Sequence, residues 1–172
     1  MVSSYPQNEN RAGIIGCQGP FIQILGGPMI SQTAEYALRA VVYLASRPEA
    51  AQTTPEIAEA TKVPAGYLAK VMQSLGRGGL VHSQRGLGGG FTLAKPADQL
   101  TVFDVIEAVD PIRRIRSCPL GLKGHISLCP LHRRLDHAMS MVEDALREST
   151  IAELLTEPGR KKGIPVPLCS DT

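Results

Sequence analysis

Residues 64–94 read PAGYLAKVMQSLGRGGLVHSQRGLGGGFTLA, and this stretch decides the fold. Its first half carries apolar residues at the three- and four-residue spacing of one helix face, namely Leu68, Val71, Met72 and Leu75. Its second half carries two short runs, 80–84 and 91–94, on either side of a glycine-rich turn, which predicts a β-hairpin. The stretch therefore predicts a helix that Pro64 opens, followed directly by a hairpin.

Two more helices are predicted upstream of this stretch. Thr53 and Glu56 have the spacing of a capping box at the start of one helix, and residues 62–63 form a short turn after it. The other helix is expected over about 31–46, with Ser31 as its N-cap. A helix, a short turn, a second helix and a hairpin follow one another in a winged helix-turn-helix. The sequence therefore predicts this fold.

The chain downstream of the hairpin predicts a helix over 101–109, a loop over 110–128 and a long helix over about 130–155. The long helix carries a heptad-like apolar seam with two further apolar residues beside it: Leu131, Leu135, Ala138, Val142 and Ala145, flanked by Met139 and Leu146. A helix of about 25 residues is ~38 Å long, which is more than a small domain covers. The seam predicts a dimer interface, and its alternative is packing against the first helix of the same chain.

The composition of the 172-residue chain favours a mainly α fold with a small β-hairpin, because 43% of the residues are apolar but only 4% are aromatic. It is unsettled whether Met1 or Met29 is the first residue, since Met29 stands just before the first predicted helix. The predicted parts are a flexible N-terminal extension (1–28), a winged helix-turn-helix DNA-binding domain (29–96), a linker helix with a Cys/His sensor loop (97–128), a dimerisation helix (129–156) and a disordered tail (157–172).

The sequence gives no sign of a membrane partner. No run approaches the ~18 apolar residues of a membrane span, and the N-terminal stretch lacks the basic start and continuous apolar segment of a signal peptide. We therefore expect a cytoplasmic protein. Its four cysteines are then expected to ligate a metal or to sense redox state rather than to form structural disulfides.

The polar side of the helix that begins at Pro64 predicts a surface for double-stranded DNA. The expected DNA-binding residues are Tyr67, Lys70, Gln73 and Arg77 on this helix and Arg85, Gly88 and Gly89 in the hairpin. Gln pairs with adenine and Lys with guanine or phosphate, whereas Arg at a glycine-rich hairpin reaches phosphate or a narrow minor groove. Each feature alone is also typical of a solvated helix face or an ordinary turn. Their order along the chain is what favours DNA binding.

The chain resembles the Rrf-type family of winged-helix transcriptional regulators, the IscR/NsrR/CymR-like proteins, over residues 29–150. The matching stretches are TAEYALR at 33–39, PAGYL at 64–68, RGLGGGFTLA at 85–94 and TVFDVIEA at 101–108. The resemblance implies a homodimer that binds a palindromic promoter site. Independently, the sequence has no HExxH or GxSxG motif and no compelling carboxylate pair, so an enzyme is not expected.

Two cysteines and two histidines lie close together in the sequence: Cys118, His125, Cys129 and His132. Cys129 and His132 are three positions apart at the start of a predicted helix, so both can face one way, and the positive end of that helix favours a thiolate. Cluster-binding members of the resembled family carry three cysteines here and a fourth, variable ligand. The resemblance implies that Cys118 and Cys129 match the outer two cysteines, while His125 lies nearest the absent middle one.

The resemblance offers two candidates for the fourth ligand, His132 or a carboxylate from the partner subunit at Glu35. The expected cofactor is a 2Fe–2S cluster, with zinc as the alternative. The predicted function is a regulator that senses iron–sulfur, redox or nitric oxide status. In this prediction the loop over 110–128 alters the spacing between the reading helices of the two subunits, which are the helices that begin at Pro64. The alternatives are a cluster-free or zinc-binding regulator that responds to a metabolite or a partner protein, and a winged helix that binds only proteins.

Overall fold

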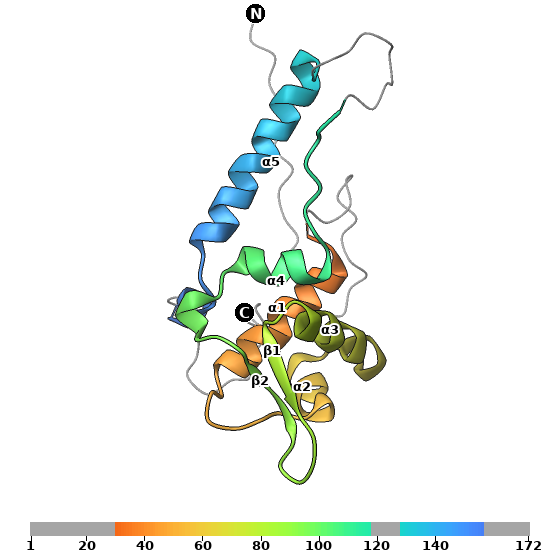
Figure 1. The fold of residues 1–172 in the computed structure, drawn as a ribbon, viewed down its shortest axis with the longest axis vertical. Helices are drawn as coiled ribbons and strands as arrows, with labels where there is room; N and C mark the ends of the chain where they lie inside the picture. Colours follow the sequence, from red (N-terminus) through yellow and green to blue (C-terminus); the bar gives the residue numbers. More distant parts are fainter. Residues whose placement is uncertain (1–29, 118–127, 157–172) are drawn as a thin grey trace, which may run out of the picture.

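The structure is a computed structural model that describes residues 30–117 and 128–156. These residues form a mostly helical body from which one long helix extends (Figure 1). The elements are α1 (Gln32–Ala45), α2 (Thr54–Thr61), α3 (Ala65–Arg77), β1 (Val81–Gln84), β2 (Gly90–Leu93), the 3-10 helix η1 (Ala97–Gln99), α4 (Val102–Val109), α5 (Pro130–Glu148) and α6 (Ile151–Thr156). The prediction of a mainly α fold with a small β-hairpin is confirmed.

The central helix of the body is α1. Ser31 caps it by accepting a hydrogen bond from the Ala34 N–H at 3.2 Å, as its sequence predicts. Eight of its 14 residues are buried, because α2, α3, α4 and α6 all pack against it. A helix that is apolar on most sides has to be surrounded in this way. The positions of the other helices are therefore set by contacts with α1.

Together α2 and α3 form the helix-turn-helix. The predicted capping box is present, since the Glu56 carboxylate accepts from the Thr53 N–H at 2.7 Å and the Thr53 hydroxyl accepts from the Glu56 N–H at 3.5 Å. The turn after α2 is tight because Lys62 adopts the left-handed conformation, with φ at 57°. Val63 is buried at this turn. The turn thus sets the direction in which α3 leaves α2.

The hairpin, or wing, consists of β1 and β2 paired antiparallel, with Gln84 opposite Gly90. Gln52, in the loop before α2, adds a bridge to it. The Gln52 N–H donates to the Phe91 carbonyl at 3.0 Å, and the Phe91 N–H donates to the Gln52 carbonyl at 2.8 Å. This close approach requires glycine at position 90, where a Cβ would lie 2.7 Å from the Gln52 backbone. The half of the wing next to its turn is therefore held to the loop between α1 and α2.

The prediction of one helix over about 130–155 is wrong, because the helix is interrupted between Glu148 and Ile151. The two residues between them pair with the segment just before α4. The Val102 N–H donates to the Ser149 carbonyl at 2.9 Å, and the Ile151 N–H donates to the Leu100 carbonyl at 2.8 Å. Backbone groups that pair across the chain in this way cannot also continue an α-helix.

A local cap completes the interruption. The Thr150 hydroxyl accepts from the Glu153 N–H at 3.2 Å, and the Glu153 carboxylate accepts from the Thr150 N–H at 2.9 Å. The redirected chain buries Ile151 in the core and packs α6 on α1. The last residues of the predicted dimerisation helix therefore belong to the body.

Helix α5 extends away from the body, and the segment over 111–117 runs beside it (Figure 1). Arg114 joins the two, since its guanidinium donates to both carboxylate oxygens of Asp136 at 2.8 Å and to Glu143 at 3.3 Å. The Ile115 N–H also donates to Asp136, at 2.9 Å. The hydrogen bonds from Arg114 hold the pKa of the Asp136 carboxyl below its usual value. None of the described helices, α5 included, is long and apolar enough to cross a membrane.

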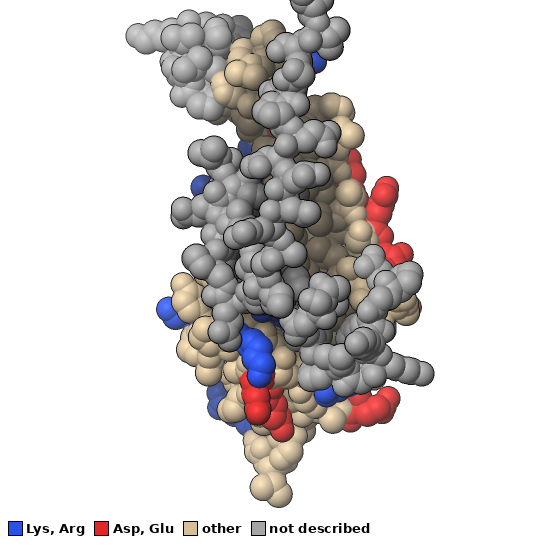
Figure 2. Space-filling view, turned by 180° about the vertical axis from the view of Figure 1, so that it is seen from behind, with Lys and Arg blue, Asp and Glu red and all other residues tan. Residues whose placement is uncertain are grey.

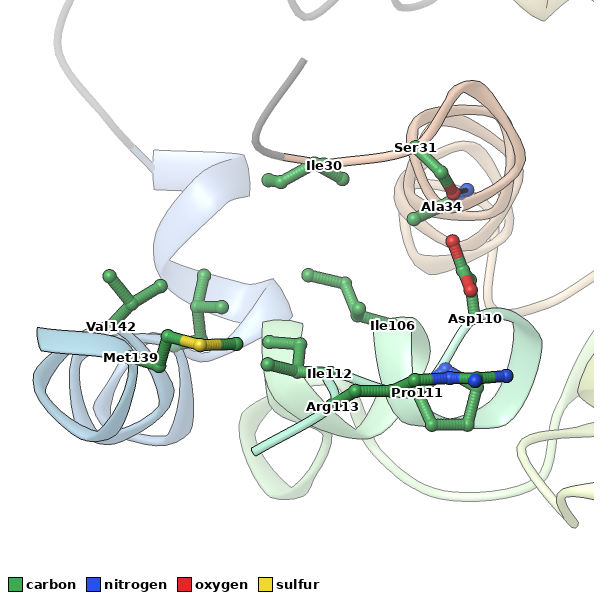
Figure 3. A pocket seen from close by; sticks show the side chains of 11 residues that line it. Ile30, Ser31, Ala34, Ile106, Asp110, Pro111, Ile112, Arg113, Met139 and Val142 are labelled. Atoms are coloured by element: carbon green, nitrogen blue, oxygen red, sulfur yellow. Dashed lines mark hydrogen bonds between the residues drawn. The ribbon is translucent and has the colours of Figure 1, made fainter. Parts of the chain in front are cut away.

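The predicted apolar seam of α5 divides between two environments. Val142 of the seam faces the body together with the flanking Met139 and Leu146, and these residues line a cavity of about 260 Å³ with the start of α1 and the end of α4 (Figure 3). In contrast, Leu131 and Leu135 are 63% and 46% exposed. No residue of α5 is fully buried. The helix thus has more apolar surface than the described part of the chain covers.

Candidate nucleic-acid interface

Helix α3 has one buried face and one exposed face. The four apolar residues that predicted the helix are all buried to 1% exposure or less: Leu68, Val71, Met72 and Leu75. The four predicted DNA-binding residues of this helix are all exposed: Tyr67, Lys70, Gln73 and Arg77. The helix therefore presents donors and acceptors outward on a firmly packed base, as a helix that enters a major groove must.

The start of the exposed face is an aromatic contact between two helices. The ring of Tyr67 on α3 meets the ring of Tyr36 on α1 edge to face, with their centroids 6.1 Å apart. The Lys70 ammonium lies 6.0 Å from the Tyr67 ring centroid. The Gln32 side chain donates to the Tyr36 hydroxyl at 2.8 Å. Sequence reasoning missed Tyr36 and Gln32, because only the packing of α1 on α3 brings them to this surface.

The wing tip contains the other predicted residues. Arg85 is exposed at the entry to the turn. Gly88 has φ at +75°, which favours glycine, and the N–H of Gly89 closes the turn by donating to the Gly86 carbonyl at 2.9 Å. A Cβ at position 89 would lie only 2.5 Å from the Gln84 carbonyl oxygen. These glycines therefore shape the turn. Sequence reasoning missed Leu87, which lies between Gly86 and Gly88 and is fully exposed.

The wing projects from the end of the body opposite α5 (Figure 1). It is fixed to α3, since the Leu80 N–H donates to the Leu75 carbonyl at 3.0 Å and the Ala94 N–H donates to the Leu80 carbonyl at 2.9 Å. The Tyr43 hydroxyl also donates to Gln52 at 3.0 Å and so supports the bridge between Gln52 and Phe91 of the wing. The reading helix and the wing thus form one surface with a fixed spacing.

The stretch of chain that forms this surface has a net positive charge. Residues 60–97, which include all of α3 and the wing, contain no Asp or Glu but five basic residues: Lys62, Lys70, Arg77, Arg85 and Lys95. In Figure 2 the lower tip of the molecule is uncharged, and the acidic side chains visible on that face lie above it. A stretch of this kind is suited to binding a polyanion, because its basic side chains attract phosphates and it contains no carboxylate that would repel them.

The predicted metal ligands lie partly outside the described residues, which do not include Cys118 or His125. Cys129 is the N-cap of α5, and its Sγ lies 3.1 Å from Nδ1 of His132. Ligands of one tetrahedral ion, at about 2.3 Å for sulfur and 2.0 Å for nitrogen, lie about 3.5 Å apart. Sγ of Cys129 and Nδ1 of His132 would therefore need to move only slightly further apart to occupy two ligand positions of such a site.

Glu35 is engaged elsewhere in the described structure. Its carboxylate forms an ion pair with Arg39 one turn later on α1, and Arg39 also donates to the Thr61 carbonyl at 3.4 Å. Within residues 30–117 and 128–156, no three His, Cys, Asp or Glu side chains gather closely enough to hold a metal ion. The described residues thus bring together two of the five predicted ligands, Cys129 and His132.

Comparisons with known proteins agree with this geometry. A family model described as Rrf2, an iron-dependent transcriptional regulator, matches residues 30–157. An Aquifex aeolicus (strain VF5) protein named as an HTH-type transcriptional regulator is 34% identical over 131 residues, which are 74% of this chain and 91% of that protein. T. potens IscR has a similar structure, with a TM-score of 0.64 at 25% identity over 75% of this chain and 87% of that chain. For CymR, the global cysteine regulator of B. subtilis, the TM-score is 0.63 at 26% identity over 74% and 95% of the two chains.

Proposed function

Because this chain belongs to the Rrf2 family of DNA-binding transcriptional regulators, we propose that α3 binds in the major groove while the wing contacts the neighbouring minor groove or backbone. The observation that carries this proposal is the exposed polar edge of α3 within a 38-residue stretch, 60–97, that has no acidic residue. Members of the family are transcriptional regulators and not enzymes. The activity that a signal would control is therefore the binding of this protein to its DNA site.

Each exposed residue has a role that its chemistry suggests. Gln73 reads a base edge, since its amide can both donate to and accept from adenine. Lys70 and Arg77 contact guanine or phosphate, and Arg85 contacts phosphate or a narrow minor groove. Tyr67 lies beside the DNA backbone, where its hydroxyl can donate a hydrogen bond to a phosphate. Gly88 and Gly89 allow the wing backbone to approach closely, because neither adds a side chain.

Selection from a randomised duplex library by the full-length protein, at a stated salt concentration, tests this proposal. We expect an enriched site that wild-type protein binds at least a thousandfold more tightly than unrelated DNA. Gln73→Ala should relax the preference at one base pair of each half-site by about tenfold. The matched control is Glu59→Gln, which changes an exposed residue of α2 outside the 60–97 stretch. Absence of any enriched site, or an unchanged preference in Gln73→Ala, would contradict this binding mode.

We further propose that the regulator is a homodimer whose interface is the exposed side of α5. The support is the surface described above, in which Leu131 and Leu135 remain largely exposed and are joined by Met141, which is 61% exposed. Large exposed apolar side chains on a helix that leaves the body are typical of an association surface. A twofold dimer would bind a palindromic site, with half-sites about 34 Å apart or a multiple of this.

A second function, metal-dependent sensing, is favoured by the Cys129–His132 pair. We propose that these two residues, with Cys118 and His125, hold a 2Fe–2S cluster or, as the alternative, zinc. A cluster would supply a reversible one-electron change of charge, whereas zinc would supply a structural link. The iron dependence after which the family is described supports the iron-containing alternative.

This sensing proposal is tested by purifying the protein without oxygen and measuring its iron, sulfide and zinc content together with its visible spectrum. Visible charge-transfer bands with two irons per chain support the cluster, and a colourless protein with one zinc supports the alternative. Cys118→Ser and Cys129→Ser should each lower the metal content, whereas Cys17→Ser, outside the proposed set, should not. Unchanged metal content in both ligand variants would contradict metal binding here. A metabolite or partner protein would then remain as the signal.

A further inference from the structure

Leu87 is the most exposed of the large apolar side chains in the described residues, at 111% of the reference exposure. An apolar side chain stabilises a protein only where it is removed from water. Leu87 therefore contributes nothing to the free energy of folding from its place at the wing tip. Its apolar surface is therefore available for burial against whatever the wing contacts.

The shape of the turn keeps this side chain outward and alone. Gly86 and Gly88 on either side of it have positive φ values of 102° and 75°. Neither neighbour has a side chain, so the tip consists of a bare backbone with one branched apolar group on it. A Cβ added at either glycine would meet nothing within 4 Å. The glycines are thus required by the backbone conformation and not by lack of space inside the protein.

A tip of this kind fits the minor groove of B-DNA. The groove is about 6 Å wide, which admits a single side chain on a narrow turn but not an α-helix. Arg85 lies two residues away, and the negative potential of a narrow A·T-rich groove attracts its guanidinium. Apolar side chains that enter the minor groove contact the sugars and the base edges. The wing therefore offers a cation for the groove entrance and an apolar group for its floor.

We propose that Leu87 enters the minor groove and selects A·T over G·C pairs at the position it covers, an inference that rests on the proposed DNA-binding mode. The floor of the groove differs between the two pairs by one group, the 2-amino group of guanine, which projects into the groove. Leu87 has no acceptor for that amino group. A G·C pair would therefore either hold the side chain out of the groove or lose the water bound to its amino group without a replacement.

The test uses a duplex that the full-length protein selects from a randomised library. Each adenine of the site is replaced in turn by 2,6-diaminopurine, which adds the minor-groove amino group and leaves the major-groove pattern of adenine unchanged. At one or two positions in each half-site we expect the Kd of wild-type protein to rise about tenfold. For Leu87→Ala the same replacements should raise the Kd less than about threefold, because the shorter side chain does not reach the floor.

Arg85→Ala is the matched variant on the same turn. It should weaken binding to these duplexes but keep the tenfold discrimination at the positions that Leu87 covers, because Arg85 at the groove entrance or on phosphate does not reach the groove floor there. Equal sensitivity to diaminopurine in wild type and Leu87→Ala would overturn the role of Leu87 while leaving the binding mode intact. A library that yields no enriched duplex would overturn the binding mode and this inference together.

Discussion

At the scale of single residues, Lys70 and Gln73 share the exposed edge of α3 but should differ in what they contribute to binding. A lysine that contacts phosphate adds affinity through the release of counterions, which is independent of sequence. Lys70→Ala should therefore weaken binding to specific and unrelated duplexes alike and reduce the slope of log K against log salt by about 1. Fluorescence anisotropy over a range of salt concentrations measures this. An unchanged slope would contradict a phosphate contact.

Gly89 is expected to be intolerant of any side chain. A Cβ there would lie 2.5 Å from the Gln84 carbonyl oxygen and 2.8 Å from the Gly86 carbonyl oxygen, both of them backbone atoms that cannot move independently. Gly89→Ala should destabilise the protein by ~1–3 kcal/mol in denaturant unfolding. Gly66→Ala is the control, because nothing lies within 4 Å of its added Cβ and alanine is the better helix former. Equal stability of the two variants would show that the turn adapts.

The polar edge of α3 could be predicted from the sequence because helical periodicity alone separates it from Leu68 and Leu75. The contact between Tyr36 and Tyr67 could not, since it depends on how α1 and α3 pack. Leu87 was visible between its glycines, but a single apolar residue in a turn has no local signature of exposure. For the metal site the sequence offered five candidates, and Cys118 and His125 lie outside the described residues.

At the scale of elements, the interruption between α5 and α6 shows where local periodicity misleads. Apolar residues resume at Ile151, Leu154 and Leu155 after the polar Ser149 and Thr150, so the whole stretch predicts one helix. Thr150 and Glu153 do have capping-box spacing, and that signal was present in the sequence. It decides the outcome only together with the long-range pairing of Ser149 with Val102, which no local pattern reveals.

Removing this cap should destabilise the body. In Thr150→Ala the Glu153 N–H loses its acceptor, and we expect a loss of ~1 kcal/mol in the free energy of unfolding. Thr156→Ala is the matched control on the same helix, because its hydroxyl only donates to the helix carbonyls of Ala152 and Glu153. Its effect should stay within about 0.5 kcal/mol. Chemical denaturation followed by circular dichroism compares them, and equal losses would argue against the cap.

The link between the 111–117 segment and α5 should depend on pH. Arg114 and the Ile115 N–H hold the pKa of Asp136 below its usual value. A lowered carboxyl pKa means that the stabilisation is fully present above the unfolded value of about 3.9 and is lost as the pH falls through the lowered folded value. The stability difference between wild type and Asp136→Asn should therefore be constant above about pH 5 and shrink below about pH 4. A difference that grows on acidification would contradict this.

At the scale of the whole molecule, α5 is the part whose position the sequence could not determine, because its apolar residues fit either its own body or a second copy. The structure shows that Met139, Val142 and Leu146 face the body. The exposed leucines remain for the proposed dimer. Leu131 and Leu135 lie on the same helical stripe as Val142 and Leu146, but nearer the start of α5. The stripe thus packs on the body at one end, and its other end is the surface of the proposed dimer.

Charged substitutions on this exposed side should separate the proposed dimer. The double variant Leu131→Glu and Leu135→Glu should sediment as a monomer and bind the palindromic site at least tenfold more weakly, because one subunit then contacts one half-site. Its circular dichroism should match wild type, since both residues are exposed in the chain itself. Arg133→Glu is the control, because it changes charge on another exposed side of α5. A double variant that still sediments as a dimer would place the interface elsewhere.

The pairing of Ser149 with Val102 has a mechanical consequence. Arg147, which stacks 3.4 Å from the centroid of the Phe103 ring, adds a second attachment at the same end of α5. The 19 residues of α5 span ~28 Å, so its rigid junction and Cys129 lie at opposite ends of the helix. A pivot of about 5° at the junction would move Cys129 by ~2.5 Å. A displacement of Cys129 by that distance would therefore need only a small rotation of α5 at the junction.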